Sequence, residues 1–532
     1  MAHTVVLLSG GIATGKSTLS MTLHDKFGAT IVKTNRVLLD KYAGAVERKS
    51  LQEYGEALDI ETGGRWVADA VVNCLQGTGP DTLLVVDAIR ILPQAEEIRK
   101  HVHGRVLHIH LLAPKEELVR RFEARRGDKP FKEALNYEDV LRSTTEQRIE
   151  GMKGAADIVI DTAESKEADV VARAAGHLGL YGREYIRLVD VLVGGQYGSE
   201  GKGHIAFFLA PEYDVLVRVG GPNAGHTVYD NGPYIHHQLP SGTRACKAFL
   251  IVGPGAVIDP AKLLKEISEC NVGPERLLVD HQAMIIEESD KAEEFDLVKN
   301  IASTGQGVGV AATRRILGRG RGDVRLARDV PALKPFIGEA LEKLERAFYR
   351  RERVFVEGTQ GAGLSLFHGP YPHVTSRDTT VSGVLAEAGI SPRRVRKLVM
   401  TCRPYPIRVQ NPPGGTSGPL NEIGWDTVSA RSHVPIETLK ATEKTSTTKK
   451  DRRVGEFEWD LLRKAASLNG PTDIALTFAD YIDAKNQNAY RFEQLTEETL
   501  RFTEELERIA AAPVSLISTG FGRRTIIDRR AW

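Results

Sequence analysis

The sequence predicts an α/β protein made of two domains. Two short apolar runs, 5–8 and 189–193, are each followed by a glycine cluster and a helix-compatible segment, the order in which an α/β domain begins. The chain of 532 residues is long enough for two or more domains. We expect a three-layer α/β/α domain over 1–178, a linker over 179–187 and a mixed α/β domain over 188–532.

The first domain alternates apolar runs with amphipathic segments, which predicts a parallel sheet wrapped by helices. One amphipathic segment is 95–102, where Ile98 and Val102 are four residues apart. A joint is expected to start at Gly176. Near the end of the chain, Leu495, Phe502, Leu506 and Ile509 keep helical spacing. The strands expected in the first domain are 5–8, 30–33, 83–87, 106–112 and 158–161.

Composition excludes several classes of protein. Lys and Arg total 71 against 70 Asp and Glu, so a net charge of +1 argues against a nucleic-acid coat or a polybasic membrane binder. There is no apolar run of transmembrane length, and the start lacks the basic region of a signal peptide. The four cysteines lie far apart and form no CxxC pair, which disfavours disulfides and zinc. We therefore expect a cytoplasmic enzyme or binding protein.

The first glycine cluster is a phosphate-binding loop. Residues 10–17 read GGIATGKS and fit G-x-x-x-x-G-K-[ST], with Gly10 and Gly15 as the two motif glycines. Lys16 supplies positive charge to the β- and γ-phosphates, Ser17 offers its hydroxyl to Mg²⁺, and Thr18 follows in the helix. A nucleoside triphosphate is the expected ligand.

Two further features support this interpretation. The apolar run 83–87 ends in Asp87, a suitable partner for Mg²⁺ or its water. A basic group could close over transferring phosphates or be a solvated helix face. The loop, VVDAIR and ARRGD together resemble nucleoside monophosphate kinases and dephospho-coenzyme A kinase over about 1–175. The basic group consists of Arg120, Arg121, Arg125 and Arg126.

The second glycine cluster is not a Walker loop, although it contains the same elements: glycines, an acidic residue and Lys202. His226 lies inside a second glycine loop, where it is poorly placed for core packing and suited to act on developing phosphate charge. Seven ordered segments resemble the adenylosuccinate synthetases, whose hallmark stretches include GDEGKG and NNAGHT, and the resemblance spans about 188–532. The segments are 194–203, 218–227, 237–242, 303–309, 357–361, 371–376 and 518–520.

The resemblance implies a ligase that phosphorylates the 6-oxo group of a purine monophosphate and then lets the aspartate amine displace the phosphate. A nucleoside triphosphate and Mg²⁺ are implied, with a homodimer through the ligase domain. The implied catalytic residues are Ser199, Lys202, His226 and Gln360. The implied purine-nucleotide residues are Asn223, Thr304, Gln360 and Thr375, and the aspartate residues are Thr447, Thr448, Lys450 and Arg452. The implied triphosphate residues are Gly198, Gly201, Lys202, Gly203, Asp480, Ser518 and Gly520, and the Gly225 carbonyl and Ser199 would meet the metal.

Two positions depart from the family's pattern. Lys450 stands where the family has arginine, so the positive charge is kept and the planar guanidinium group, which can donate two parallel hydrogen bonds, is lost. Ser199 stands where the family has the aspartate that takes the N1 proton of the purine. Serine is no base of that strength, which leaves three explanations: a decayed or regulatory homologue, an IMP enzyme with another base, or a changed substrate. The intact motifs favour the changed substrate, because a short hydroxyl leaves room for the 2-amino group of guanine, and the pattern resembles the phage 2-aminoadenylosuccinate synthetases, which act on dGMP.

The phosphoryl donor stays open between ATP and GTP. Asp480 matches the family's guanine-reading aspartate, which favours GTP. Phe478 replaces the family's lysine and Phe521 replaces its proline, and the resembled phage branch uses ATP or dATP, which favours ATP. The candidates for an arginine that reaches across a dimer are Arg314, Arg315, Arg319 and Arg321.

Two other features have alternative explanations. His108 and His110 share one face of an expected strand, and satisfied core histidines are favoured there over a metal site. The P-loop half is expected to be a kinase in a bifunctional enzyme, with a nucleotide-sensing module or an assembly domain as alternatives.

Overall fold

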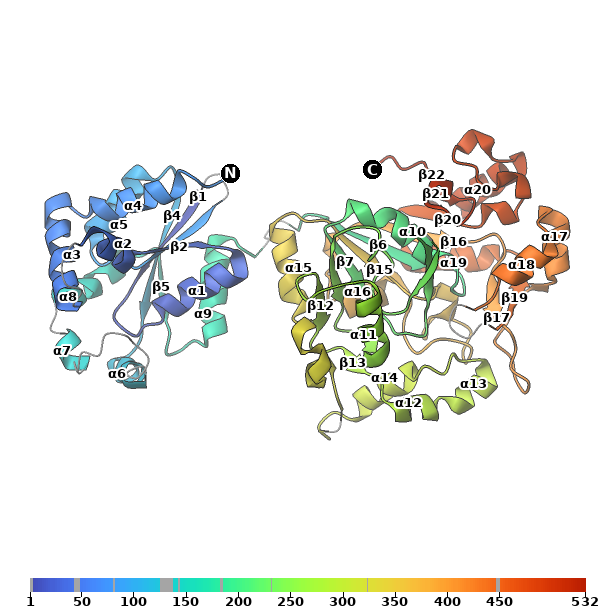
Figure 1. Ribbon diagram of the computed structural model, residues 1–532, viewed down its shortest axis with the longest axis horizontal. Helices are drawn as coiled ribbons and strands as arrows, with labels where there is room; N and C mark the ends of the chain where they lie inside the picture. Colours follow the sequence, from blue (N-terminus) through green and yellow to red (C-terminus); the bar gives the residue numbers. More distant parts are fainter. Residues whose placement is uncertain are drawn as a thin grey trace. The chain divides into compact units, whose positions relative to one another are not determined.

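The structure is a computed structural model, and it describes residues 3–42, 48–79, 82–124, 137–141, 144–181, 185–230, 232–322, 324–445 and 450–532. The chain divides into two compact units, Met1–Arg183 and Glu184–Trp532. Each unit has its own sheet and its own apolar cores (Figure 1). The α/β class expected from the sequence is confirmed in both units.

The first unit contains a five-stranded parallel sheet in the order β2-β3-β1-β4-β5. All five strands expected from the sequence are present. Their bounds are β1 (His3–Ser9), β2 (Thr30–Lys33), β3 (Leu83–Asp87), β4 (Gly104–Leu112) and β5 (Ile158–Asp161). The helices are α1 (Lys16–Phe27), α2 (Thr34–Lys41), α3 (Arg48–Thr62), α4 (Arg65–Leu75), α5 (Leu92–His101), α6 (Lys115–Ala124), α7 (Tyr137–Leu141), α8 (Thr144–Glu150) and α9 (Glu167–Leu178).

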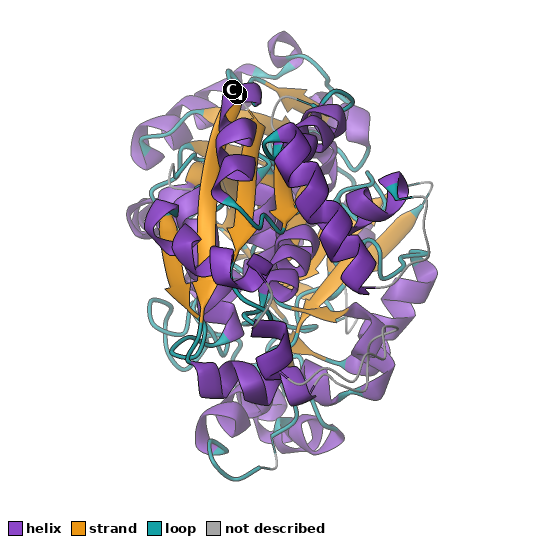
Figure 2. Cartoon of the chain, turned by 90° about the vertical axis from the view of Figure 1, so that its left-hand side faces the viewer, coloured by secondary structure: helices purple, strands orange, loops and turns teal. Residues whose placement is uncertain are grey.

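Helices cover both faces of this sheet (Figure 2). Successive side chains of β1 point to opposite faces, so Val6 and Leu8 pack with α1 and α9, whereas Val5 and Leu7 pack with α4 and α5. All four side chains are fully buried. The central strand is therefore apolar on both faces, and its carboxyl end leads directly into the glycine loop 10–17.

The second unit contains a ten-stranded sheet in the order β14-β12-β10-β7-β15-β6-β16-β20-β21-β22, parallel except for the last pair. Its strands are β6 (Val189–Gly194), β7 (Val215–Arg218), β10 (Phe249–Val252), β12 (Leu277–Asp280), β14 (Ile337–Gly338), β15 (Val354–Glu357), β16 (Val395–Cys402), β20 (Asp473–Leu476), β21 (Val514–Ser518) and β22 (Ile526–Asp528). Three small sheets are added: β8 (His226–Tyr229) with β9 (Pro233–His236), β11 (Val257–Ile258) with β13 (Met284–Ile285), and β17 (Ile407–Val409) with β18 (Glu422–Ile423) and β19 (Arg452–Gly455).

Helices also cover both faces of the large sheet. The core on one face includes α15, α16, α19 and α20, and the core on the other includes α10 and α11. The helices are α10 (Lys202–Leu209), α11 (Pro260–Glu269), α12 (Glu288–Glu293), α13 (Phe295–Ile301), α14 (Val308–Leu317), α15 (Ala340–Tyr349), α16 (Val381–Ala388), α17 (Trp425–Ser432), α18 (Ile436–Thr442), α19 (Trp459–Asn469) and α20 (Glu497–Ala510).

Two expectations about element boundaries are wrong. The joint does not start at Gly176, because α9 continues to Leu178 and ends at Gly179 in the left-handed conformation. Leu495 is not part of the last helix, because α20 begins at Glu497, whereas Phe502, Leu506 and Ile509 do lie on it. Among the described residues, no helix combines the length and apolarity needed to cross a bilayer.

Candidate active site

A cavity of about 1050 Å³ opens in the second unit, around the carboxyl ends of the central strands. It is lined by most of the residues that the sequence assigned to the ligase site. These are Gly198, Ser199, Gly201, Lys202, Gly203, Asn223, Gly225, His226, Thr304, Gln360, Thr375, Arg452, Asp480, Ser518 and Gly520. Lys450 does not line it, and Thr447 and Thr448 lie outside the described residues.

The glycine loop between β6 and α10 places Lys202 at the start of a helix. Gly198 (φ 86°) and Gly201 (φ 77°) adopt left-handed conformations, which glycine tolerates best. The buried Glu200 carboxylate accepts hydrogen bonds from the amides of Gln196 (3.0 Å) and Gly198 (2.8 Å). Lys202 Nζ lies 2.5 Å from Glu200 Oε2. Glu200 therefore fixes the loop around the Lys202 ammonium group at the N-terminus of α10. Such an arrangement is suited to binding phosphate.

His226 belongs to a buried charge network that the sequence did not reveal. Arg218 and Glu357 end the neighbouring strands β7 and β15 and are register partners, and Arg218 Nη1 donates to Glu357 Oε1 at 2.7 Å. His226 Nδ1 bonds the same carboxylate. Burial, followed by the charge of Arg218, lowers the pKa of His226 to about 4. Neutral His226 thus donates Nδ1–H to Glu357, which fixes its tautomer and leaves Nε2 for the cavity.

The Glu357 carboxylate is fully satisfied. The Ser241 backbone amide (2.7 Å) and hydroxyl (2.5 Å) also donate to it. Although burial raises its pKa, the charge of Arg218 and the hydrogen bonds from His226 and Ser241 hold that pKa at about 2. The sequence signal that marks Glu357 and Arg218 is a charged residue at the end of an otherwise apolar strand.

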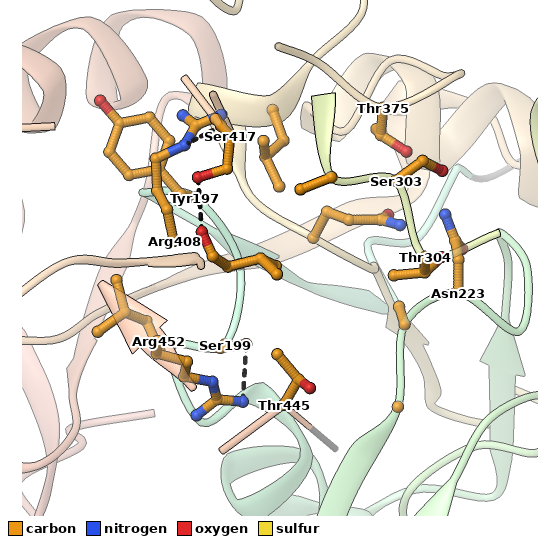
Figure 3. Close-up of a pocket in the computed structure, with 18 of the residues that line it drawn as sticks. Tyr197, Ser199, Asn223, Ser303, Thr304, Thr375, Arg408, Ser417, Thr445 and Arg452 are labelled. Carbon is orange, nitrogen blue, oxygen red and sulfur yellow. Dashed lines mark hydrogen bonds between the residues drawn. The ribbon is translucent and has the colours of Figure 1, made fainter. Parts of the chain in front are cut away.

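Ser199 lies next to Arg452 on one side of the cavity (Figure 3). It adopts φ 56°, and its hydroxyl accepts a hydrogen bond from Arg452 Nη2 at 3.3 Å. Arg452 and the buried Arg403 both pair with Glu443, at 2.9 Å and 2.6 Å. Burial raises the pKa of Glu443, but these two arginines outweigh it and hold the pKa at about 2. Glu443 and Arg403, both missed from the sequence, thus fix the position of Arg452.

Asn223, Thr304 and Thr375 lie together on another side of the cavity (Figure 3). The buried side-chain oxygens of Asn223 and Gln360 have no hydrogen-bond partner among the described residues. Gln360 also adopts φ 55°, a conformation that residues other than glycine seldom adopt. These two acceptors are therefore available to N–H or O–H groups of a ligand or of water in the cavity.

Another wall of the cavity contains Tyr197 and Arg408, neither of which the sequence had assigned to the site. The Arg408 guanidinium lies 4.4 Å from the centroid of the Tyr197 ring and donates to the Ser417 carbonyl at 2.7 Å. The Tyr197 hydroxyl donates to Glu458 at 2.9 Å. Burial lowers the pKa of Arg408 to about 10, so it remains a cation at neutral pH.

Asp480 lies close to the glycine loop, next to Phe478. It is 9% exposed, and among the described residues no other residue donates a hydrogen bond to its carboxyl group. Burial raises its pKa to about 7.

The candidate cross-dimer arginines differ in their contacts. Arg314 on α14 forms a bidentate pair with Asp290 at 3.0 and 2.7 Å, so its guanidinium is committed within its own chain. Arg315 donates to the Gln282 carbonyl at 2.8 Å and Arg319 to the Ile316 carbonyl at 2.9 Å.

In the first unit, the glycine loop 10–17 that the sequence predicts to bind phosphate joins β1 to α1. Lys16 Nζ donates to the Gly10 and Gly11 carbonyls, each at 2.7 Å, and Gly15 (φ 93°) precedes α1, which carries Ser17 and Thr18. Asp87 at the end of β3 accepts from Ser20 on α1 at 3.1 Å. The loop, its lysine and Asp87 thus meet at the carboxyl edge of the sheet.

The expected basic group is only partly described. Arg120 and Arg121 lie on α6 and pair with Glu117 at 2.7 and 2.6 Å, and Arg121 also donates to Thr162. These two side chains are therefore anchored in the resting fold, and Arg125 and Arg126 lie outside the described residues.

His108 and His110 both bond the Ser9 hydroxyl, at 2.6 and 2.8 Å. Among the described residues, no three His, Cys, Asp or Glu side chains are grouped as a metal site. Both imidazoles are buried, and Nδ1 of His108 has no hydrogen-bond partner among the described residues.

A glycine loop with a helix-initiating lysine at a large cavity is typical of α/β enzymes that handle nucleotides. The family model of adenylosuccinate synthetase matches residues 191–329 and 324–487. The chain belongs to the adenylosuccinate synthetase family, and its second unit is a ligase of that type.

Three known proteins illustrate the similarity. The adenylosuccinate synthetase of Methanocaldococcus jannaschii is 38% identical over 350 residues, which is 64% of this chain and 96% of that protein. The succinoaminodeoxyadenylate synthetase of cyanophage S-2L, solved with dGMP and with dATP as an energy donor, is 28% identical with a TM-score of 0.55, covering 65% of this chain and 96% of that one. The adenylosuccinate synthetase of Plasmodium falciparum, 22% identical with a TM-score of 0.55 over 64% of this chain and all of that one, shares the fold.

Proposed function

We propose that the second unit joins GMP or dGMP to L-aspartate and forms 2-amino-(deoxy)adenylosuccinate. The observation that carries this proposal is Ser199, a small neutral residue where the family has an aspartate, in a cavity that keeps the other expected groups. The cyanophage S-2L relative, solved with dGMP, supports the same substrate.

The reaction follows from the groups around the cavity. O6 of the purine attacks the γ-phosphorus of the triphosphate, the bond from that phosphorus to the β,γ-bridging oxygen breaks, and the nucleoside diphosphate leaves. N1 releases its proton to solvent, and the 6-phosphoryl compound forms. The aspartate amine then attacks C6, loses a proton and expels phosphate, which is a far better leaving group than an oxo group. Lys202 and the loop amides hold the γ-phosphate, and His226, fixed by Glu357, contacts the transferring phosphoryl group.

Guanine fits the polar groups better than hypoxanthine does. Guanine adds a 2-amino group beside N1, and the Ser199 hydroxyl, already a hydrogen-bond acceptor for Arg452, keeps a second lone pair for an N–H. The unpartnered oxygens of Asn223 and Gln360 give the bound nucleotide two further acceptors. Arg452, which lines the cavity, would bind an aspartate carboxylate, whereas Lys450 does not line the cavity and is left out of this proposal.

Mg²⁺ fits this site, because the oxygens of Gly225 and Ser199 line the same cavity as Lys202 and oxygen is the ligand that Mg²⁺ prefers. When bound with the substrate phosphates, Mg²⁺ would neutralise charge that develops during phosphoryl transfer. We also propose that the protein forms a homodimer through the second unit. Its substrates are small molecules, and it acts in the cytoplasm.

Product analysis by mass spectrometry tests the substrate. Purified protein receives Mg²⁺, aspartate, one of IMP, GMP or dGMP, and either ATP or GTP. We expect a succinylated purine from GMP or dGMP and none from IMP. Product from IMP alone would refute the argument from Ser199 and leave an adenylosuccinate synthetase that tolerates serine.

We also propose that the first unit binds a nucleoside triphosphate and transfers its γ-phosphoryl group to a small acceptor. The observation behind this proposal is the lysine-bearing loop at the end of the central strand, with Asp87 on the neighbouring strand. Lys16→Ala is expected to abolish triphosphate turnover measured without aspartate, whereas the exposed Lys166→Ala leaves it unchanged. The first unit would instead be a sensing module if the unaltered protein shows no such turnover and Lys16→Ala abolishes the control of the ligase by nucleotide.

A further inference from the structure

Three polar side chains form a hydrogen-bonded chain at the carboxyl end of β1 in the first unit. The Ser9 hydroxyl bonds Nε2 of His108 at 2.6 Å and Nδ1 of His110 at 2.8 Å. Ser9 is the last residue of β1 and the register partner of His110 on β4, and all three side chains are buried. The chain therefore lies inside the fold, directly before the glycine loop 10–17.

The end of β4 packs directly on this loop. A Cβ at Gly10 would collide with the carbonyl oxygen of Leu111, the residue after His110. Lys16 Nζ donates to the Gly10 carbonyl at 2.7 Å. His110 is thus next to the part of the loop that carries the lysine expected to hold the γ-phosphate.

The hydrogen-bonded chain lies on the face of the sheet opposite α1. Leu7, on the same face as Ser9, packs with α4 and α5, whereas Asp87 accepts a hydrogen bond from α1. Ser17 and Asp87, the groups expected near Mg²⁺, are therefore on the α1 side. In-line transfer requires the acceptor to approach the γ-phosphorus from the side opposite the leaving diphosphate. We expect the acceptor on the face that carries Ser9 and His110.

The hydroxyl of Ser9 determines which protons the histidines carry. A serine hydroxyl has one proton, so it donates to one of the two histidines and accepts from the other. When Ser9 donates to Nε2 of His108, His110 donates Nδ1–H to Ser9, and Nε2 of His110 keeps a lone pair. A nitrogen in this state can accept a proton from a substrate.

We propose that Nε2 of His110 accepts the proton of the acceptor's hydroxyl group, and that the first unit therefore phosphorylates an alcohol. This inference rests on the phosphoryl-transfer function proposed above and specifies its acceptor. A phosphate monoester loses its last proton at a pH of about 6, so a phosphate oxygen that acts as nucleophile at neutral pH gains nothing from a base.

The proposed step moves three protons along the chain. The alcohol oxygen attacks the γ-phosphorus, the bond from that phosphorus to the β,γ-bridging oxygen breaks, and the nucleoside diphosphate leaves. The hydroxyl proton passes to Nε2 of His110, the Nδ1 proton of His110 passes to Ser9, and the Ser9 proton passes to Nε2 of His108. His108 is left protonated, and the chain returns the proton to solvent by the reverse route after the phosphorylated product has left.

The charges around the chain favour this direction. Burial, followed by His108 and then by the charge of Lys16, lowers the pKa of His110 to about 4. Burial and the charge of Arg99 also lower the pKa of His108, whereas Asp157 raises it. The Asp157 carboxylate accepts from the His108 amide at 2.7 Å. The proton therefore ends beside a carboxylate and away from the lysine of the loop.

The first test follows phosphate release from ATP by the full chain without aspartate or a purine monophosphate, so that water is the hydroxyl acceptor. His110→Asn keeps an amide that can bond Ser9 and removes Nε2. We expect kcat to fall about 10²-fold or more, with the KM for ATP within threefold of the parent. The matched control His103→Ala alters an exposed histidine and should change neither constant. A kcat of His110→Asn within threefold of the parent would overturn the inference.

Chemical rescue separates a base from a merely structural residue. His110→Ala removes the ring and leaves space for free imidazole. We expect added imidazole to raise the ATP hydrolysis rate of this variant at least tenfold and to leave Lys16→Ala inactive. If His110→Ala melts at the temperature of the parent and imidazole does not restore its rate, His110 is not the base.

The class of acceptor is tested with ATP labelled at the γ-phosphate and a protein-free small-molecule extract of bacterial cells. Phosphate esters of alcohols survive brief heating in strong acid, whereas the phosphoanhydrides formed on a phosphate acceptor hydrolyse. We expect the label that the parent transfers and Lys16→Ala does not to be stable to acid. Acid-labile label would overturn the inference and keep the transfer function, whereas the absence of Lys16-dependent label would remove that function.

A spectroscopic measurement needs no turnover. Nitrogen-15 NMR of the full chain with Mg²⁺ and ADP reports which ring nitrogen of His110 carries the proton, with His110→Asn used to assign the signal. We expect His110 to be protonated at Nδ1 and not at Nε2. Protonation at Nε2 would overturn the inference even if no acceptor were phosphorylated.

Discussion

Replacing Glu357 with glutamine removes the charge on which Arg218 and His226 depend. The Glu357 side chain is 1% exposed and that of Arg218 is 2% exposed, so the substitution leaves a buried guanidinium without a counter-ion. Breaking a buried pair in this way costs about 3–5 kcal/mol. Unfolding a unit of this size changes the entropy by about 0.7 kcal/mol/K, so we expect the melting temperature of the second unit to fall by about 4–7 °C.

The same substitution acts on catalysis. A glutamine accepts a weaker hydrogen bond from His226 Nδ1–H and no longer fixes the ring against a buried positive charge. Loss of a positioned group of this kind lowers the rate by about 10²-fold or more. The assay compares kcat well below both melting temperatures, with saturating substrates, alongside thermal unfolding followed by calorimetry.

Glu266→Gln is the matched control. Glu266 is equally buried, but its carboxylate accepts only from backbone amides, at 2.8 Å from His237 and 3.0 Å from Leu239, and it does not line the cavity. We expect a smaller loss of stability and a kcat within threefold of the unaltered protein. The reasoning about Glu357 is wrong if its glutamine variant melts within 1 °C of the parent or keeps kcat within threefold.

Three further predictions follow from the site. Ser199→Asp should place a carboxylate against the guanine amino group and shift product formation from dGMP towards IMP, which the same mass-spectrometric assay detects. Arg452→Lys should raise the KM for aspartate about tenfold with little change in the KM for dGMP, because the bidentate fork is lost; an unchanged aspartate KM would remove Arg452 from the site. Burial lowers the folded-state pKa of His204 and His226 to about 4 and of His236 to about 3, so the unfolded chain takes up these protons first below pH 6.5. The unfolding free energy should therefore fall by about 4 kcal/mol per pH unit between pH 6 and pH 4.5, measured by chemical denaturation, and a flat profile would contradict neutral buried histidines.

Local sequence patterns predicted the first unit well because its strands are short apolar runs that lie between helices on both faces. Ser199, Lys202 and His226 could be singled out because they lie in glycine-rich segments whose composition is unlike that of core elements, and the structure places all three around one cavity. The charge partners of these residues were not found. Glu357 and Arg218 are adjacent only because β15 pairs with β7, and no local pattern encodes that pairing.

The same limit applies to Glu443 and Arg403, which approach each other through the tertiary fold. Motifs identify the groups that would touch substrate, whereas sheet order determines the groups that orient them. The conformations of Ser199 and Gln360, both with positive φ, were likewise invisible in the sequence, because these residue types seldom adopt them.

The sheet order of the second unit also constrains how the protein is synthesised. Val189 on the first strand of this unit pairs with Val354 and Val395, which leave the ribosome much later. All five strands of the first unit precede residue 162, so that unit can fold during translation. The nascent second unit must keep an apolar strand unpaired until β15 and β16 emerge, and chains that stop before them are expected to aggregate. We therefore expect the first unit to fold early in synthesis and without the rest of the chain. The second unit is expected to fold only after nearly all of its residues have been synthesised.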